Sequence, residues 1–436
     1  MKTRKYLSVK SLYQRVRAGF AEVSDTRTGD VKITMTDALQ SAFALFALKD
    51  PSLLAFEARR PDPNGNLRRI FGIHRVPSDT QSRTILDPVD PAALCPVFKD
   101  IFRQLQRGKA LESYVFLEGC YLVSSDGTGY FYSPTIHCPF CLERKNSHTG
   151  EISYYHQLLE GVLVHPDLRT VIPLAPEPII KQDGSTKNDC ERNAAKRFWA
   201  HVREDHPHLR LIALEDALYA NAPHILELRQ HKIHYILGVK PGDHEYLFDA
   251  VQRAHQQGET TEWEVYQDGA RHCFRWLNQV PLNKSHPDVL VNFLEYWEIT
   301  PHSTQHFTWI TDFTITVDNA CRLMRGGRAR WKSENETFNT LKNHGYHFEH
   351  NFGHGQQHLS VVLATLMLLA FLVDQAQQIG CRLFQAVLAK LGSHRQLWDD
   401  VRALFRVLPL ESMEELYRAL LHGFVVLNWQ ILYDSC

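Results

Sequence analysis

The segment from residue 116 to 250 constrains the fold of this chain more than any other part of its sequence. Three strand-like runs come first, at 116–125, 153–165 and 170–174. A helical stretch follows, and strands and helices then alternate up to the strand-like run His234–Val239. Consecutive strands followed by alternating strands and helices are typical of a mixed α/β sheet. We therefore predict a fold of the α/β class, with such a sheet in this segment.

The regions on either side differ from this segment in pattern. Residues 1–115 look mostly helical, and strong helical signal returns at about 317–342 and fills most of 356–423. Between 250 and 316 helical signals are few, and alternating or aromatic-rich pieces predict strands. We expect a helical N-terminal region over 1–115, a core over 116–355 with a β-rich insertion at 250–316, and a helical C-terminal region over 356–436.

Composition indicates a soluble intracellular protein whose positive charge is local. The 436 residues are 44% hydrophobic and 22% charged, as in ordinary globular proteins. The formal net charge is −1, whereas residues 322–332 carry five cations and no anion. Nine cysteines are too few for a disulfide scaffold, and the start of the chain lacks the apolar core of a signal peptide. The longest apolar stretch, Leu359–Val373, is shorter than a membrane span and is expected to be a buried helix.

Two acidic residues end apolar runs inside the predicted sheet. Asp126 follows Tyr-Leu-Val-Ser-Ser, and Asp216 follows Leu-Arg-Leu-Ile-Ala-Leu-Glu. A strand end holds a carboxylate rigidly, and Gly127 would let the backbone turn away directly after Asp126. The alternatives are an ordinary Asp-Gly turn at 126 and a helix N-cap at 216.

A third acid, Glu334, belongs to a segment with helical spacing. Arg330, Glu334, Phe338 and Lys342 share one face, which thus carries a cation, an anion, an apolar anchor and a second cation. A salt-bridged surface helix is the alternative to a functional role. Glu336 competes with Glu334, although it points away from it on an α-helix. Two carboxylates at strand ends and a third on a later helix can converge on a pair of divalent ions.

The segment Arg-Trp-Lys-Ser-Glu-Asn-Glu-Thr-Phe-Asn-Thr-Leu-Lys, residues 330–342, resembles the signature helix of bacterial insertion-sequence transposases with a DDE catalytic triad. These transposases belong to the retroviral-integrase superfamily, and the segment is most similar to their branch with an Arg-Trp-x-x-Glu-Asn helix. Ser-Asp-Gly-Thr at Asp126 and Asp-Ala-Leu-Tyr at Asp216 match the family in kind and order. The resemblance covers roughly 116–355, and the insertion lies between the second and third acids as in that family.

The resemblance implies a ribonuclease-H-like fold and a transposase that cuts element ends and joins them to target DNA. Asp126 would bridge two Mg²⁺ or Mn²⁺ ions, and Asp216 and Glu334 would each complete one metal site. DNA phosphates would be held by the neighbouring cations Arg325, Arg328, Arg330, Lys332 and Lys342. The chain departs from the family in two places: Gly327 stands where the family has tyrosine, and the lysine at 342 lies one residue further from the glutamate.

The partners implied are double-stranded DNA, as terminal inverted repeats and target, and a second copy of the chain, because both element ends must be held together. The N-terminal helical region would bind DNA, and the protein would reside in the bacterial cytoplasm, at the nucleoid and not at a membrane. Two other readings share these residues. One is a catalytically inactive relative that only binds DNA, and the other is a metal-dependent nuclease that cuts without joining.

A Cys-x-x-Cys motif provides a second candidate metal site. Cys138 and Cys141, with His148 and His156 downstream, are the ligand types of a structural zinc site. We expect the motif on the turn between the first two strands, where a metal would hold an irregular hairpin together. The alternative is a pair of packed or free thiols with surface histidines.

Overall fold

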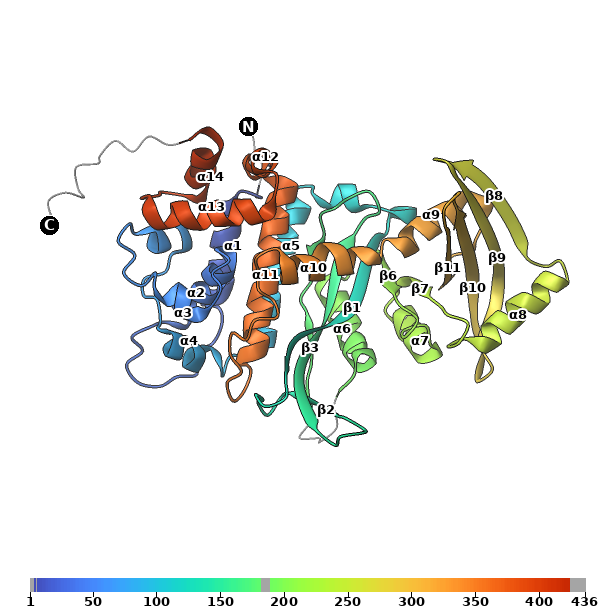
Figure 1. Ribbon diagram of the computed structural model, residues 1–436, viewed down its shortest axis with the longest axis horizontal. Helices are drawn as coiled ribbons and strands as arrows, with labels where there is room; N and C mark the ends of the chain where they lie inside the picture. The colour runs from blue at the N-terminus through green and yellow to red at the C-terminus, as the bar shows by residue number, and fades with distance from the viewer. Residues whose placement is uncertain (1–3, 5, 182–188, 424–436) are drawn as a thin grey trace. The chain divides into compact units, whose positions relative to one another are not determined.

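The computed structural model describes residues 4, 6–181 and 189–423, which belong to two compact units. One unit combines residues 1–110 with 341–436 and is helical, and the other is residues 111–340 (Figure 1). The protein is mixed α/β, with 45% of residues in helices and 22% in strands of one mixed sheet, which confirms the predicted class. The last part of the expected C-terminal region, 424–436, lies outside the described residues.

Helices from the two ends of the chain build the helical unit. From the N-terminal part come α1 (Val9–Ala21), α2 (Met35–Ala47), α3 (Leu53–Glu57), α4 (Asp79–Leu86) and α5 (Cys95–Arg107). From the C-terminal part come α11 (Leu359–Gly380), α12 (Arg382–Leu391), α13 (His394–Val407) and α14 (Met413–His422). Side-chain caps fix several helix starts. The Thr34 hydroxyl, for example, accepts the Asp37 N–H before α2.

α11 is the central apolar helix of this unit. Within the described residues it is the one helix long and apolar enough to cross a bilayer. In its most apolar stretch, 94% is buried inside the protein. It is therefore packed as a core helix, as expected for 359–373. Its Asp374 carboxylate lies 2.7 Å from the Nζ of Lys49, which is fully buried, and accepts a hydrogen bond from the Tyr346 hydroxyl.

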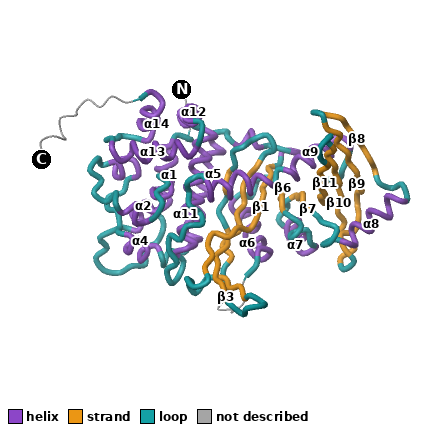
Figure 2. The backbone as a smooth tube through the Cα atoms, in the orientation of Figure 1, coloured by secondary structure: helices purple, strands orange, loops and turns teal. Residues whose placement is uncertain are grey.

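The second unit is built on an eleven-stranded sheet (Figure 2). Its strand order is β2-β3-β1-β6-β7-β11-β10-β9-β8, with β4 and β5 also paired to β3. β1 pairs parallel to β6 and β6 parallel to β7, while the other pairs are antiparallel. The first seven strands are β1 (Tyr121–Ser133), β2 (Leu142–Lys145), β3 (Ile152–Val164), β4 (Ile172–Pro173), β5 (Glu177–Ile179), β6 (Leu211–Glu215) and β7 (His234–Gly238).

The predicted β-rich insertion forms four further strands of the same sheet. These are β8 (Thr261–Gln267), β9 (Ala270–Asn283), β10 (His286–Ile299) and β11 (Thr304–Thr311). β11 pairs with β7, with Trp309 opposite Gly238, so the insertion extends the sheet at the parallel strands. The helices of this unit are α6 (Glu191–Asp205), α7 (Ala222–Gln230), α8 (Glu245–Gln256) and α9 (Val317–Arg328), and α10 (Asn339–Asn343) crosses the boundary between the units.

Candidate active site on the mixed sheet

Asp126 lies within β1, and the prediction that it ends its strand is wrong. β1 continues to Ser133, because β3 pairs with it in antiparallel register and places Glu160 opposite Asp126. The parallel ladder between β1 and β6, however, ends at the Ser124–Leu214 pair. Asp126 therefore lies just beyond the last parallel pair. At Asp126, β1 still pairs with β3 but no longer pairs with β6.

Gly127 does not turn the chain, as the sequence suggested, but makes room for another acid. A Cβ atom at this position would lie 2.4 Å from Oε1 of Glu191, the first residue of α6. The Tyr219 hydroxyl donates to the other carboxylate oxygen, Oε2, at 3.5 Å. Sequence reasoning missed Glu191, because a glutamate in a mixed-charge helix is ordinarily solvated. The sequence feature that could have pointed to Glu191 is its place in the first turn of a helix that directly follows the first strands of the sheet.

Asp216 directly follows β6, where the sequence placed it. Its Oδ1 accepts the Leu218 N–H at 2.9 Å, which fixes the chain as it leaves the strand. The preceding Glu215 is fully buried and holds the strand end in place through three partners: Ser125 Oγ at 2.7 Å, Trp199 Nε1 at 2.9 Å and His224 Nε2 at 2.6 Å. Glu215 is thus a structural carboxylate, and Asp216 is the one at the site.

Glu334 meets Asp126 through the guanidinium of Arg330. Arg330 Nη1 lies 3.4 Å from Asp126 Oδ2, and Nη2 lies 3.0 Å from Glu334 Oε1. The predicted regular helix is interrupted here. α9 ends at Arg328, and residues Ser333–Phe338 form a π-helical turn. The Ser124 hydroxyl of β1 donates to the Arg330 carbonyl at 3.2 Å, and this bond ties the interruption to the strand that carries Asp126.

Burial and several charged neighbours act on Asp126. Burial raises the pKa of Asp126 to about 6, against the lowering effect of Arg330 and with further increases from Asp216, Glu191 and Glu334. Burial and Asp216 likewise raise the pKa of Glu191. Three carboxylates thus act on Asp126, and one guanidinium is paired with Asp126 and Glu334. Carboxylate oxygens are the ligands that Mg²⁺ and Mn²⁺ prefer, so these residue types suit such ions. Among the described residues, however, these acids do not form a group whose ligand oxygens all lie within 4.8 Å of one another.

Glu336, the competing third acid, lies beside a different charge. Burial lowers the pKa of Lys332, and Glu336 opposes that shift. The acids that raise the pKa of Asp126 include Glu334, which also pairs with Arg330. The structure therefore brings Glu334 to Asp126 and places Glu336 near Lys332.

Four of the five predicted phosphate-binding cations are engaged with other protein groups. Arg330 is the member of that set that contacts acids of the site. Lys342 is in the helical unit, where it pairs with Glu349. The remaining three contacts are Arg325 with Asp167, Arg328 with Glu298, and Lys332 with the Leu168 carbonyl.

A cavity of about 620 Å³ opens beside the acids. Asp216 and Arg330 line it together with aromatic and basic side chains that include Lys240, Phe307, Trp309, Arg328 and Trp331. At Gly327, where the transposases that segment 330–342 resembles would have a tyrosine, a Cβ atom would lie 2.5 Å from the Trp309 indole. The indole of β11 therefore occupies the space that a side chain at 327 would need.

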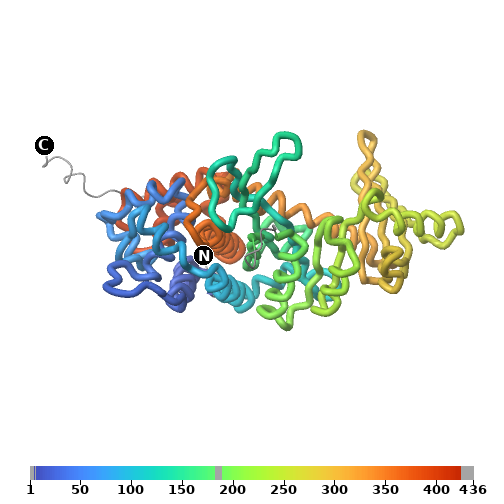
Figure 3. Tube along the Cα trace, turned by 90° about the horizontal axis from the view of Figure 1, so that it is seen from below, coloured from blue at the N-terminus to red at the C-terminus, as the bar shows by residue number. Residues whose placement is uncertain are grey.

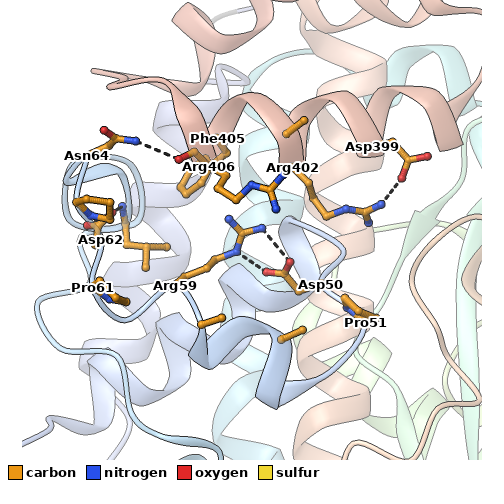
Figure 4. A pocket seen from close by; sticks show the side chains of 15 residues that line it. Asp50, Pro51, Arg59, Pro61, Asp62, Asn64, Asp399, Arg402, Phe405 and Arg406 are labelled. Atoms are coloured by element: carbon orange, nitrogen blue, oxygen red, sulfur yellow. Dashed lines mark hydrogen bonds and ion pairs between the residues drawn. The ribbon is translucent and has the colours of Figure 1, made fainter. Parts of the chain in front are cut away.

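The helical unit has a separate pocket of about 570 Å³, shown in Figure 4. Two of the arginines that line it, Arg59 and Arg402, interact with other protein groups. Arg59 forms two hydrogen bonds with Asp50, and Arg402 pairs with Asp399 and donates to the Lys49 carbonyl. We assign this pocket no role.

The predicted zinc ligands divide into a cluster and an outlier. Cys138, Cys141 and His156 come together in the second unit and could bind a metal ion. The cysteines lie between β1 and β2, as predicted. His148 instead lies on the exposed turn between β2 and β3, where its backbone N–H donates to the Asn146 side chain.

Comparisons with known proteins assign no family. No protein-family model matches the sequence, and no curated protein matches it significantly. Function is therefore inferred from the residues and their geometry.

Proposed function

We propose that this chain is a DNA transposase of the DDE type, with a ribonuclease-H-like core, that acts on the ends of an insertion element. One observation carries the proposal. Asp126, Asp216 and Glu334 come from two neighbouring parallel strands and a later helical turn, and both Asp216 and Glu334 raise the pKa of Asp126. Their order along the chain and their supporting elements are those that the resemblance implies.

In this proposal Asp126, Asp216 and Glu334 would together hold the divalent ions. Bound Mg²⁺ or Mn²⁺ would lower the pKa of the attacking water or DNA 3′-hydroxyl and stabilise the leaving oxygen. Arg330 already lies among the acids, and it would bind a phosphate oxygen of the scissile strand. Glu215 and its buried partners would keep Asp216 at a fixed place during the reaction.

The cavity beside Asp216 supports a nucleic-acid substrate. It combines aromatic rings with cationic groups, which are the side chains that stack on bases and neutralise phosphates. Trp331 is 56% exposed, and its indole is open to such stacking. The strand next to the scissile phosphate would lie here. The helical unit would bind the terminal repeats, and a homodimer would hold two ends in the bacterial cytoplasm.

The decisive experiment first searches the DNA on either side of the coding region for the inverted repeats that this proposal expects, and then uses them as labelled duplexes. With the full-length chain and Mg²⁺, we expect cleavage at the repeat boundary and joining to a target plasmid. Asp126→Asn, Asp216→Asn and Glu334→Gln should abolish both steps but keep DNA binding. Glu336→Gln, in the same helical turn, is the matched control and should retain activity.

Two outcomes would replace the proposal. Cleavage of the labelled ends without joining would indicate a nuclease of the same fold. Binding without metal-dependent cleavage by the wild-type chain would indicate a catalytically inactive DNA-binding relative. Equal loss of activity in the Glu334 and Glu336 variants would remove the assignment of the third acid.

A further inference from the structure

Three potential metal ligands meet on the hairpin formed by β1, β2 and β3. The Sγ atoms of Cys138 and Cys141 are 3.7 Å apart, and His156 Nε2 lies 3.4 and 3.3 Å from them. All three side chains are buried. Neither cysteine is in a disulfide, so the contact is between two thiol groups.

These separations are those of a tetrahedral zinc site. Zinc–sulfur bonds of about 2.3 Å and zinc–nitrogen bonds of about 2.0 Å place tetrahedral ligands about 3.8 Å apart for two sulfurs and about 3.5 Å apart for sulfur and nitrogen. The three measured distances match these edges to within about 0.3 Å. Two sulfurs joined in a disulfide would instead be about 2.05 Å apart.

The backbone holds the ligands in this arrangement. The Cys138 N–H donates to Cys141 Sγ at 3.3 Å, and the Cys141 N–H donates to the Cys138 carbonyl at 3.1 Å, so a tight turn gathers both sulfurs. His156 lies on β3 opposite Phe131, next to the irregularity in β1 between Gly129 and Phe131. Ligands from a loop and from a neighbouring strand are thus brought to one point.

We infer that Cys138, Cys141 and His156 form a structural zinc site. Two thiolates and an imidazole favour zinc over Mg²⁺ or Mn²⁺, so this site differs in chemistry from the acids at Asp126. The inference does not depend on transposition. The three residues would supply three of the four ligands that tetrahedral zinc needs.

The position of the site explains what the metal would do. The hairpin projects from the strands of its unit, as the turquoise trace in Figure 3 shows, and Tyr132 near its end is 69% exposed. Zinc would fasten the loop after β1 to β3, and would thereby fix the pairing of the two strands that also place Asp126 opposite Glu160.

The test measures zinc in the full-length protein, purified without chelator, by mass spectrometry of the metal. We expect about one zinc per chain. Cys138→Ser, Cys141→Ser and His156→Asn should each lose most of it. Cys273→Ser and His148→Asn are matched controls, because Cys273 lies in β9 and His148 on the exposed turn, and both should keep the full content.

A second measurement keeps the inference testable if the ligand variants fail to fold. Zinc is removed from the wild-type chain and replaced by Co²⁺, which should give the visible spectrum of a tetrahedral ion and a thiolate-to-cobalt charge-transfer band. Protease cleavage in the loop after β1 should increase in the zinc-free protein and return to its original rate when zinc is added.

Three results would overturn the inference. The first is a wild-type protein that neither contains zinc nor takes it up from a chromogenic chelator. The second is full zinc content in the Cys138 and Cys141 variants. The third is a disulfide between these cysteines in protein purified without reductant, since oxidised sulfurs would not serve as thiolate ligands.

Discussion

Replacing Asp126 by asparagine should stabilise the metal-free protein above pH 6. Burial and three neighbouring carboxylates raise the pKa of Asp126 from its ordinary 3.8 to about 6, although Arg330 lowers it. Between these two values the folded state binds more protons than the unfolded state. The free energy of unfolding therefore falls as pH rises from about 4 to about 6, and the loss is complete above pH 6. Asparagine keeps the size of the side chain and removes the charge.

The size of the effect follows from the shift in pKa. A shift of about two units corresponds to about 3 kcal/mol at 1.36 kcal/mol per unit. The Asp126 side chain is 22% exposed, so solvent screening makes about 2 kcal/mol a realistic value. In a unit of this size, about 2 kcal/mol raises Tm by about 4–8 °C.

The assay compares thermal unfolding of the wild type and Asp126→Asn from pH 5 to pH 8 in EDTA. The difference in Tm should grow as pH rises to about 6.5 and then stay constant. Asp249→Asn, which changes an exposed carboxylate on α8, is the control and should follow the wild type. Parallel curves for the wild type and Asp126→Asn, or a variant less stable than the wild type at pH 8, would refute the reasoning.

Three further predictions concern the same unit. At a concentration of 100 times its Kd, Mn²⁺ should stabilise the folded wild type by about 2.7 kcal/mol and raise its Tm by several degrees, whereas the Tm of Asp126→Asn should not change. Gly127→Ala should displace the Glu191 carboxylate and reduce this Mn²⁺ response, whereas Gly129→Ala, whose Cβ meets nothing closer than 3.8 Å, should not. Gly327→Ala should lower stability by about 1–2 kcal/mol in chemical denaturation, because the clash with Trp309 outweighs about 1 kcal/mol of helix propensity. An Ala variant at 327 as stable as the wild type would contradict that packing.

The sequence predicted Asp216 better than Asp126, and the sheet explains the difference. β6 is a short strand with buried residues along its whole length, so its apolar run ends where the strand ends and Asp216 follows directly. β1 has a second partner, β3, which carries the strand through Asp126 and Gly127. The local preference of Asp-Gly for a turn is overridden by that pairing, which no local pattern contains.

Other features depended on contacts between distant segments. The strands of the insertion were predictable, because alternating side chains mark each half-buried strand. Glu191 was not, since its place beside Asp126 depends on the absence of a side chain at Gly127. The π-helical turn was also missed, because it accompanies a hydrogen bond from the Ser124 hydroxyl to the Arg330 carbonyl, across more than 200 residues.

Arg330 links the proposed metal and DNA sites through charge. In the metal-free protein its guanidinium offsets part of the repulsion between Asp126 and Glu334. Divalent ions bound by the same carboxylates would take over that neutralisation, and Arg330 would then be free to pair with a phosphate. Metal and DNA should therefore bind cooperatively, with each raising affinity for the other by the same factor. Arg330→Ala should weaken that coupling and, because it removes the cation that lowers the pKa of Asp126, make metal binding more dependent on pH.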